Sequence, residues 1–282
     1  MQLLGFNLHP HLKLLNSVNT GFEKFWVDEF LKCGDFRFSK NRLLERIDQE
    51  INPPKFDSKD VFILSEENIS GHIYTGCNAK IYADRIFDSF GKIKIFMMIR
   101  KQSDYLLSAY SNFINHGGAL SLEVWLTDEN FPINSMKEKL KYDLLISYYM
   151  NLFGKENVFV LPYEFFFLKG EIPVMNAFFE FLGLEPIPES GFHSSKKVNA
   201  SFSPIGVRFA RLVNGIRGGG SNNQRRFLKA TDKFVFQPLS CKFKPALISE
   251  KKLFEFSEEF RLSNQITSKL IGVDLKNLSY PV

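Results

Sequence analysis

The sequence has little of what marks a membrane-spanning or secreted protein. Its longest apolar run, Ile93–Ile99 with Lys94 inside it, is far shorter than the roughly 18 residues that cross a bilayer. The first fifteen residues lack the basic leader and the small-residue cleavage site of a signal peptide. We therefore expect no transmembrane segment and no secretory leader.

Cysteine and histidine are also too sparse to form a framework. Cys33, Cys77 and Cys241 are odd in number and far apart, which fits neither a set of disulfides nor paired zinc ligands. The five histidines are dispersed, and we interpret each as an ordinary surface or core residue. A reducing, cytoplasmic location without a metal site is the expectation.

Apolar and charged residues are plentiful. A hydrophobic fraction of 44% over 282 residues supports one or two packed cores and excludes intrinsic disorder. The net charge of +5 is uneven, since residues 196–252 carry thirteen Lys or Arg against only Asp232 and Glu250. Such a segment is a solvated surface, an anionic-polymer footprint or the lid over a multiply charged ligand. Its cations are dispersed and accompany no nucleic-acid-binding motif, so no nucleic-acid partner is expected.

Strand and helix patterns alternate along the chain. Short apolar runs at Val61–Leu64, Ile93–Ile99 and Val158–Leu161 predict strands that are buried on both faces of a parallel sheet. Residues 1–50 are interpreted as helical pieces. Later helices are expected over 78–90, 103–115 with Ser103 as N-cap, 142–153, 173–181 and 250–271. The alternation predicts an α/β fold with right-handed crossovers.

Polar side chains follow two of the predicted strands. Glu66 and Glu67 come after the first strand, and Arg100 comes directly after the second, with Ser108 eight residues later. Ligands of open α/β sheets bind outside the carboxyl ends of the strands. A guanidinium, a hydroxyl and a helix N-terminus together suit an oxyanion such as phosphate. Two plainer interpretations stay open, a surface ion pair for Arg100 and helix capping for the carboxylates.

The stretch from Lys94 to Tyr110 resembles the 3′-phosphate-binding segment of the sulfotransferase superfamily, in which a strand ends in Arg and a Ser follows eight residues on. Further stretches look like ordered landmarks of bacterial members, from about Asp60 to the end of the chain. These landmarks are residues 62–67, 158–164, 178–184, 197–201, 262–264 and 272–275.

The resemblance implies a three-layer, P-loop-NTPase-like parallel sheet flanked by helices, with a helical C-terminal region. We expect a single sulfotransferase-like domain over residues 1–282. Within it, a helical lead-in covers 1–59, the parallel-sheet core covers 60–185, and a basic loop region with the C-terminal helix covers 186–282.

The resemblance also implies an activity. Family members transfer a sulfuryl group from 3′-phosphoadenosine 5′-phosphosulfate, the co-substrate, to an acceptor hydroxyl, and they need no metal. Arg100, Ser108 and Lys197 match donor-binding positions, and Glu67 or Glu66 stands where members place the base. The acceptor is a glycan, a lipid or a small molecule. The sequence does not define the acceptor further, nor the oligomeric state.

One family feature has no match in the sequence. Members begin with a strand and a Gly-rich loop of the Pro-Lys-x-Gly-Thr-Thr kind, which holds the 5′-phosphosulfate. Residues 1–30 resemble the part of the family chain that comes after this loop and its helix. We therefore expect an incomplete start or a lost half-site, and no sulfuryl transfer by the 282-residue chain alone.

The alternative function is that of a catalytically inactive relative, which binds a nucleotide, an anionic glycan or a protein partner. A phosphotransferase is disfavoured because the sequence has no Walker-type Lys-Ser/Thr pair.

Overall fold

The computed structural model describes residues 11–14, 24–51, 59–128, 133–188, 203–218, 228–236 and 247–282. Its contacts fall into two compact units, each assembled from separate stretches of chain. The first unit comprises residues 1–99, 142–198 and 267–273, and the second comprises residues 100–141, 199–266 and 274–282. The expected single-domain organisation stays a prediction.

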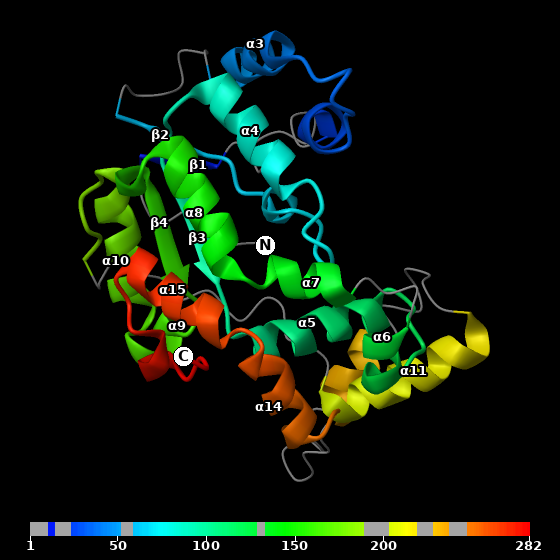
Figure 1. Ribbon diagram of the computed structural model, residues 1–282. Coiled ribbons are helices and arrows are strands. Elements are labelled where there is room, and N and C mark those ends of the chain that lie inside the picture. The colour runs from blue at the N-terminus through cyan, green and yellow to red at the C-terminus, as the bar shows by residue number, and fades with distance from the viewer. Residues whose placement is uncertain are drawn as a thin grey trace. The chain divides into compact units, whose positions relative to one another are not determined.

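Four short strands of the first unit form two parallel pairs (Figure 1). Strand β1 (Leu12–Leu14) pairs with β2 (Val61–Ile63), and β3 (Ile95–Ile99) pairs with β4 (Val158–Pro162). The expectation of an α/β chain with parallel strands is confirmed, whereas the described strands form two pairs rather than one continuous sheet. The helical elements of this unit are η2 (Val27–Leu31), α3 (Lys40–Ile51), η3 (Glu67–Ser70), α4 (Ala79–Phe90), α8 (Tyr142–Phe153), η4 (Lys155–Asn157), α9 (Phe165–Leu168) and α10 (Glu171–Leu182).

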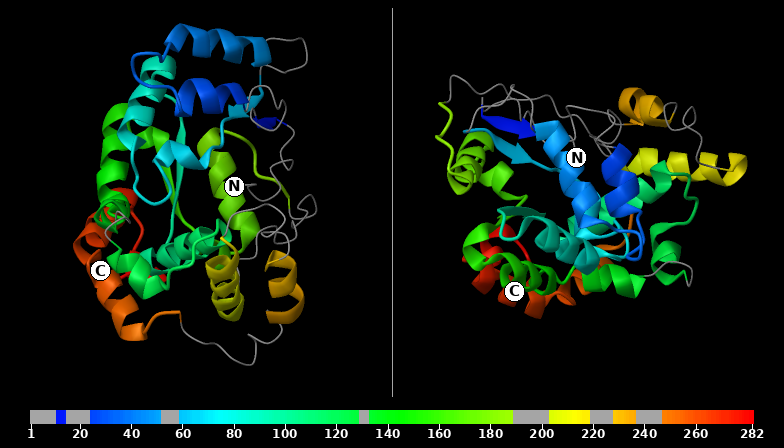
Figure 2. Two further views of the ribbon diagram at one scale, coloured as in Figure 1. Left: turned by 90° about the vertical axis from the view of Figure 1, so that its right-hand side faces the viewer. Right: turned by 90° about the horizontal axis from the view of Figure 1, so that it is seen from above.

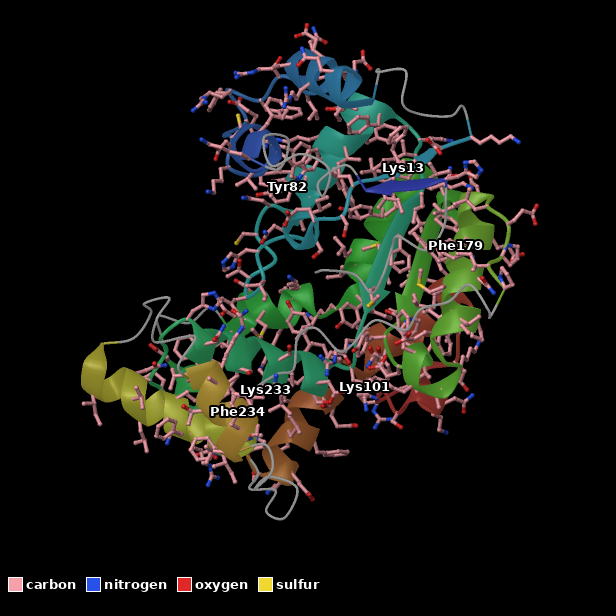
Figure 3. The ribbon with its side chains drawn as sticks, turned by 180° about the vertical axis from the view of Figure 1, so that it is seen from behind. Lys13, Tyr82, Lys101, Phe179, Lys233 and Phe234 are labelled. Carbon is pink, nitrogen blue, oxygen red and sulfur yellow. The ribbon has the colours of Figure 1, made fainter. Side chains whose placement is uncertain are left out.

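Strand β1 corrects the sequence analysis, which predicted only helical pieces over residues 1–50. Its ladder is extended by the amide of Val61, which donates to the carbonyl of His11 at 2.7 Å. The Asp60 carboxylate lies 3.2 Å from Nδ1 of His11 and 3.9 Å from Nζ of Lys13, so an ion cluster fixes the start of the pair. Figure 2 shows β1 and β2 side by side, and Figure 3 shows Lys13 on β1.

A helix over residues 24–31 follows β1 in the chain and packs against α4. Trp26 and Phe30 are almost fully buried and stack with ring centroids 4.0 Å apart. The buried guanidinium of Arg85, from α4, donates to the carbonyl oxygens of Phe30 and Cys33. The described residues before β2 therefore include a strand and a docked helix, where the sequence analysis expected helical pieces alone. That the N-terminal strand and loop of the family are missing stays a prediction.

One apolar cluster joins both strand pairs to α10. Its buried members include Leu12 of β1 and Phe178 and Phe179 of α10, with Phe96 of β3 and Phe159 of β4 packed against them. Helix α8 contacts β3 and β4 as well. Burial of each large apolar side chain contributes about 1.5–3 kcal/mol, so this cluster stabilises the arrangement of the four strands.

The second unit is helical in its described residues. Leu106, Tyr110 and Ile114 of α5 are buried, and Trp125 packs on Tyr110 at 5.5 Å. The helix predicted over 250–271 is broken at Glu259 and Phe260, because Phe260 turns into the core and is fully buried. No described helix is long and apolar enough to span a bilayer. The elements are α5 (Gln102–Asn115), α6 (Leu122–Thr127), α7 (Ile133–Lys139), α11 (Pro204–Arg217), η6 (Asp232–Phe236), α14 (Glu250–Glu258), α15 (Arg261–Ile271), which continues into the first unit, and η7 (Leu275–Leu278).

Candidate functional site

Arg100 occupies the predicted position at the carboxyl end of a parallel strand. It follows Ile99 of β3 directly, and the carbonyl of Ile99 accepts a hydrogen bond from the amide of Tyr163 at 2.8 Å, just beyond β4. Arg100 itself is half-buried. Only Arg100 and Lys101 separate β3 from α5, so the end of the strand leads at once into the first turn of a helix.

The start of α5 is set by a buried pair of amides rather than by the expected Ser103 cap. The helix begins at Gln102, with Lys101 as N-cap and no side-chain capping bond. Gln102 and Asn264 are 1% and 0% exposed. Nε2 of Gln102 donates to Oδ1 of Asn264 at 2.7 Å, and Nδ2 of Asn264 donates to the carbonyl of Pro281 at 2.9 Å. These bonds tie the first turn of α5 to α15 and to the last residues of the chain.

Ser108 lies on a polar face of α5. Side chains three or four positions apart share one face of a helix, which places Ser108 with Lys101, Asp104, Tyr105 and Asn112, all of them half-buried. At 1.5 Å per residue, Ser108 is about 9 Å along the axis from the first residue of α5. Arg100 comes two residues before the start of α5, Ser108 is the seventh residue of that helix, and both belong to the second compact unit.

Two lysines that the sequence analysis did not single out belong to this face. Nζ of Lys101 lies 3.7 Å from the Asp104 carboxylate, and Nζ of Lys139, from α7, lies 5.6 Å from the centroid of the Tyr105 ring. Lys101 could have been noticed from its place beside Arg100, whereas Lys139 is 31 residues further along the chain than Ser108 and carries no local signal. Lys139 adds positive charge next to the face that carries Ser108, whereas the charge of Lys101 is balanced by Asp104.

The two candidate base residues lie in the first unit, at the end of β2. Glu66 is the N-cap of η3, where its carboxylate accepts bonds from the backbone and side-chain amides of Asn68 at 3.1 and 2.9 Å. The capping interpretation therefore holds for Glu66. Glu67 is the first residue of η3, and its side chain lies outside the described part of the structure, as does all of Lys197. The roles of Glu67 and Lys197 stay predictions.

A tight loop follows η3 and was not anticipated. Gly71 has a φ of +86°, and a Cβ there would lie 2.3 Å from the carbonyl oxygen of Gly76, so only glycine fits. The loop exposes His72, whose Nδ1 is 3.3 Å from Oγ1 of Thr75. Burial raises the pKa of Tyr74 to about 12, so this phenol stays protonated at neutral pH.

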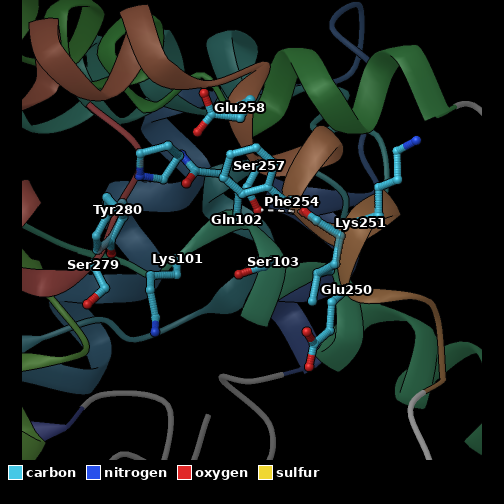
Figure 4. A pocket seen from close by; sticks show the side chains of 12 residues that line it. Lys101, Gln102, Ser103, Glu250, Lys251, Phe254, Ser257, Glu258, Ser279 and Tyr280 are labelled. Atoms are coloured by element: carbon cyan, nitrogen blue, oxygen red, sulfur yellow. Dashed lines mark hydrogen bonds between the residues drawn. The ribbon is translucent and has the colours of Figure 1, made fainter.

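An open groove of 680 Å³ borders the first turn of α5 (Figure 4). The groove is lined by three segments. These are the start of α5 with Lys101, Gln102 and Ser103, helix α14 with Phe254, and the C-terminal residues with Tyr280. Its charge is mixed, because Glu250 and Glu258 also line it, and its lining includes neither Arg100 nor Ser108. The groove therefore borders the α5 face that carries Ser108 and is not that face itself.

Within the residues that the structure describes, no group of three or more His, Cys, Asp or Glu side chains could hold a metal ion. Cys33 is a buried free thiol and Cys77 is an exposed one. Cys241 lies outside the described residues.

Comparisons with known proteins are informative about the fold. No protein-family model and no curated protein matches the sequence. The crystal structure of a sulfotransferase from Alicyclobacillus acidocaldarius is similar in fold, with a TM-score of 0.55 over 96% of this chain and 90% of that chain, at 15% sequence identity. At this identity the likeness shows a sulfotransferase-like fold, and the reaction is a separate question.

Proposed function

We propose that the chain is a sulfotransferase that moves a sulfuryl group from 3′-phosphoadenosine 5′-phosphosulfate to an acceptor hydroxyl. The observation that carries the proposal is Arg100 at the carboxyl end of parallel strand β3, followed at once by α5 with Ser108 on its polar face. This arrangement occurs in a chain that shares its fold with a sulfotransferase over nearly its whole length.

In this proposal Arg100 and Ser108 bind the 3′-phosphate of the donor. A guanidinium offers two parallel donors to a phosphate, and a hydroxyl adds a third. The N-terminal turn of α5 contributes partial positive charge, and Lys101 lies on the same face. Lys197 is a further candidate donor ligand by resemblance alone.

The 5′ end of the donor would be held after β1. In this proposal strand β1 and the helix over residues 24–31 take the place of the strand and helix that a phosphosulfate loop connects, and their presence supports an active chain. The connection, residues 15–23, contains Ser17, Thr20 and Gly21 in its sequence but no Lys or Arg. The cation of the family loop is therefore not supplied from this stretch.

The chemical step needs a base at the acceptor. The acceptor oxygen forms a bond to sulfur while the bond from sulfur to the phosphate oxygen breaks, so 3′-phosphoadenosine 5′-phosphate leaves with the electron pair. Glu67 takes the acceptor proton in this scheme. Glu66 is the weaker candidate because its carboxylate already caps η3. Positioning and charge supply the rest of the catalysis, as in phosphoryl transfer, and the step needs no metal.

The test is transfer of labelled sulfur from the donor to a panel of glycans, lipids and small alcohols. We expect Glu67→Gln to lower kcat by about 10²–10⁴ with nucleotide affinity nearly unchanged, as loss of a general base does. Glu66→Gln is the matched control and should change kcat little, because the amide oxygen of Gln can still accept from Asn68 and cap η3. A larger loss of kcat at Glu66 would move the base by one residue, and no loss at either would reject a carboxylate base.

The second candidate function is a catalytically inactive binding protein with the same fold, and the lack of a cation in residues 15–23 favours it. Such a protein would bind 3′-phosphoadenosine 5′-phosphate through Arg100 but would transfer no sulfur to any acceptor. Nucleotide binding without turnover across the whole panel would therefore select this alternative. The proposed location for either function is the cytoplasm.

A further inference from the structure

Helix α11 carries apolar residues on two opposite faces. One face packs on α5. On it, the side chains of Val207 and Ala210 are 1% exposed and that of Asn214 is 3% exposed. Nδ2 of Asn214 donates to the carbonyl oxygens of Ile114 and Gly118, at 2.8 Å each, and so fixes the rotation of α11 about its axis. Asn214 therefore determines which residues α11 presents on its other side.

The outer face of α11 is apolar and exposed. Leu212 and Ile216 are four positions apart, so they share a face, and they are 61% and 84% exposed. An ordinary surface helix is polar on this side, because the apolar stripe of a helix normally faces a core. A second apolar stripe is a sign of an interaction surface.

Segment η6 packs on α11 and carries exposed apolar side chains of its own. The Asp232 carboxylate accepts from the amide and the hydroxyl of Ser203, at 3.1 and 2.5 Å, and Ser203 caps α11. The rings of Phe209 and Phe236 pack 5.0 Å apart, which locks η6 onto α11. Figure 2 shows the two segments side by side, α11 in yellow and η6 in orange.

Segment η6 adds two exposed apolar side chains, Phe234 at 74% and Val235 at 47%, with Lys233 beside them (Figure 3). Lys229 and Lys233 are exposed, and so is Arg208 of α11. The one carboxylate of these segments, Asp232, is 2% exposed and faces inward. We call the set of Arg208, Leu212, Ile216, Lys229, Lys233, Phe234 and Val235 the α11–η6 surface.

We propose that the α11–η6 surface binds an anionic membrane surface. Exposed apolar side chains flanked by Lys and Arg are the composition of segments that lie in the bilayer interface, with apolar groups among the acyl chains and cations at the headgroups. Each cation near an anionic leaflet contributes about 1 kcal/mol, or roughly fivefold in affinity. The surface belongs to the segment whose sequence carries eleven excess positive charges, which suits an anionic partner.

The composition of the α11–η6 surface argues against two other partners, a second copy of the chain and a nucleic acid. A second copy of the chain would bring one cationic surface against another, and like charges repel. A nucleic acid would leave Leu212 and Ile216 without an apolar partner. This inference does not depend on the sulfuryl-transfer proposal, because none of the seven residues belongs to the candidate site.

The test is co-sedimentation of the full chain with two kinds of vesicle, phosphatidylglycerol mixed with phosphatidylcholine and phosphatidylcholine alone. We expect binding to the anionic vesicles only, weakened by salt. Two double variants should each weaken binding to the anionic vesicles at least about tenfold. One combines Ile216→Ser with Phe234→Ser, and the other combines Lys229→Glu with Lys233→Glu. The changed residues are exposed, so thermal unfolding of the variants should match the wild type.

Matched controls separate this surface from general stickiness and net charge. Phe167→Ser removes an equally exposed ring from α9, at 70% exposure, and Lys251→Glu with Lys276→Glu makes the same change in net charge elsewhere. Both controls should bind as the wild type does. The proposal is overturned by equal binding to neutral vesicles, by no binding to either kind, or by controls that lose as much as the variants. It is also overturned if the surface variants abolish instead a dimer in sedimentation velocity or binding to an oligonucleotide.

Discussion

At the scale of single residues, Gln102 and Asn264 show how the candidate site is held in place. Each amide is buried and bonded to the other, and Asn264 also bonds the end of the chain. A buried amide that loses its partner pays the full cost of desolvation. The pair therefore fixes the first turn of α5, next to the proposed phosphate ligand Arg100.

We predict that Gln102→Ala and Asn264→Ala each lower the free energy of unfolding by about 2–4 kcal/mol, since each removes buried volume and leaves the other amide unpaired. The double variant should cost less than the sum, with a coupling of about 0.5–3 kcal/mol. Urea denaturation measures all three. Gln49→Ala, at an exposed position of α3, is the control and should change stability by no more than about 0.5 kcal/mol. Additive losses would show that the two amides act independently.

The residue scale also shows why the candidate site was only partly predictable. The sequence offers Arg100 and Ser108 as candidates because their spacing is local and a strand end marks the first of them. Glu66 and Glu67 look alike in sequence as adjacent carboxylates, and the capping bond from Asn68 to Glu66 depends on a backbone geometry that the sequence does not show. Lys139 reaches the face through α7, which no local pattern indicates.

At the scale of elements, the loop Gly71–Asn78 gives a direct test of the described backbone. We predict that Gly71→Ala destabilises the protein strongly, because its φ of +86° disfavours a side chain and its Cβ would meet backbone 2.3 Å away. Such a sparsely populated backbone conformation alone costs about 1–3 kcal/mol for a residue with a side chain. Gly91→Ala is the matched control, with a φ of +67° and nothing within 4 Å of its Cβ, and it should cost only that amount.

Thermal unfolding of Gly71→Ala and Gly91→Ala measures the two losses of stability. A larger loss at Gly71 than at Gly91 supports the close approach of Gly71 to Gly76, and equal losses would contradict it. The same loop carries His72 and Tyr74, which follow the proposed base Glu67 closely in the sequence.

Elements with strong local patterns were predicted, and those made by distant contacts were not. Strand β4 and helix α8 match their predicted ranges closely, because continuous apolar runs and helical spacing are local signals. Strand β1 was missed because three residues with Lys13 in the middle carry almost no periodicity. It pairs with β2, 49 residues away, and is fixed by contacts such as that of His11 with Asp60. The start of α5 moved from Ser103 to Gln102 because a buried tertiary bond overrides capping preference.

At the scale of the whole molecule, tyrosine burial predicts how stability changes in alkali. Burial raises the pKa of Tyr74 to about 12 and also raises the pKa values of Tyr110 and Tyr149. The unfolded state releases these protons near pH 10, which is lower than in the folded state. The stabilising contribution is therefore complete below about pH 10 and is lost as pH rises through the folded values.

We expect spectrophotometric titration of the native chain to show some of its nine tyrosines ionising near pH 10 and a further group only at higher pH or on unfolding. Tyr74→Phe should reduce by one the number of tyrosines that ionise only at higher pH. Ionisation of all nine tyrosines in a single step near pH 10 in the folded protein would contradict the described burial.

The proposed donor site is built around Arg100, and calorimetric titration with two nucleotides tests it most directly. We predict that the chain binds 3′-phosphoadenosine 5′-phosphate more tightly than adenosine 5′-phosphate, which lacks the 3′-phosphate. Arg100→Ala should weaken binding of 3′-phosphoadenosine 5′-phosphate by on the order of 2–4 kcal/mol, about 30- to 700-fold. It should barely change the binding of adenosine 5′-phosphate. A wild type that binds both nucleotides equally, or neither, or an Arg100→Ala variant that keeps the preference, would contradict this donor site.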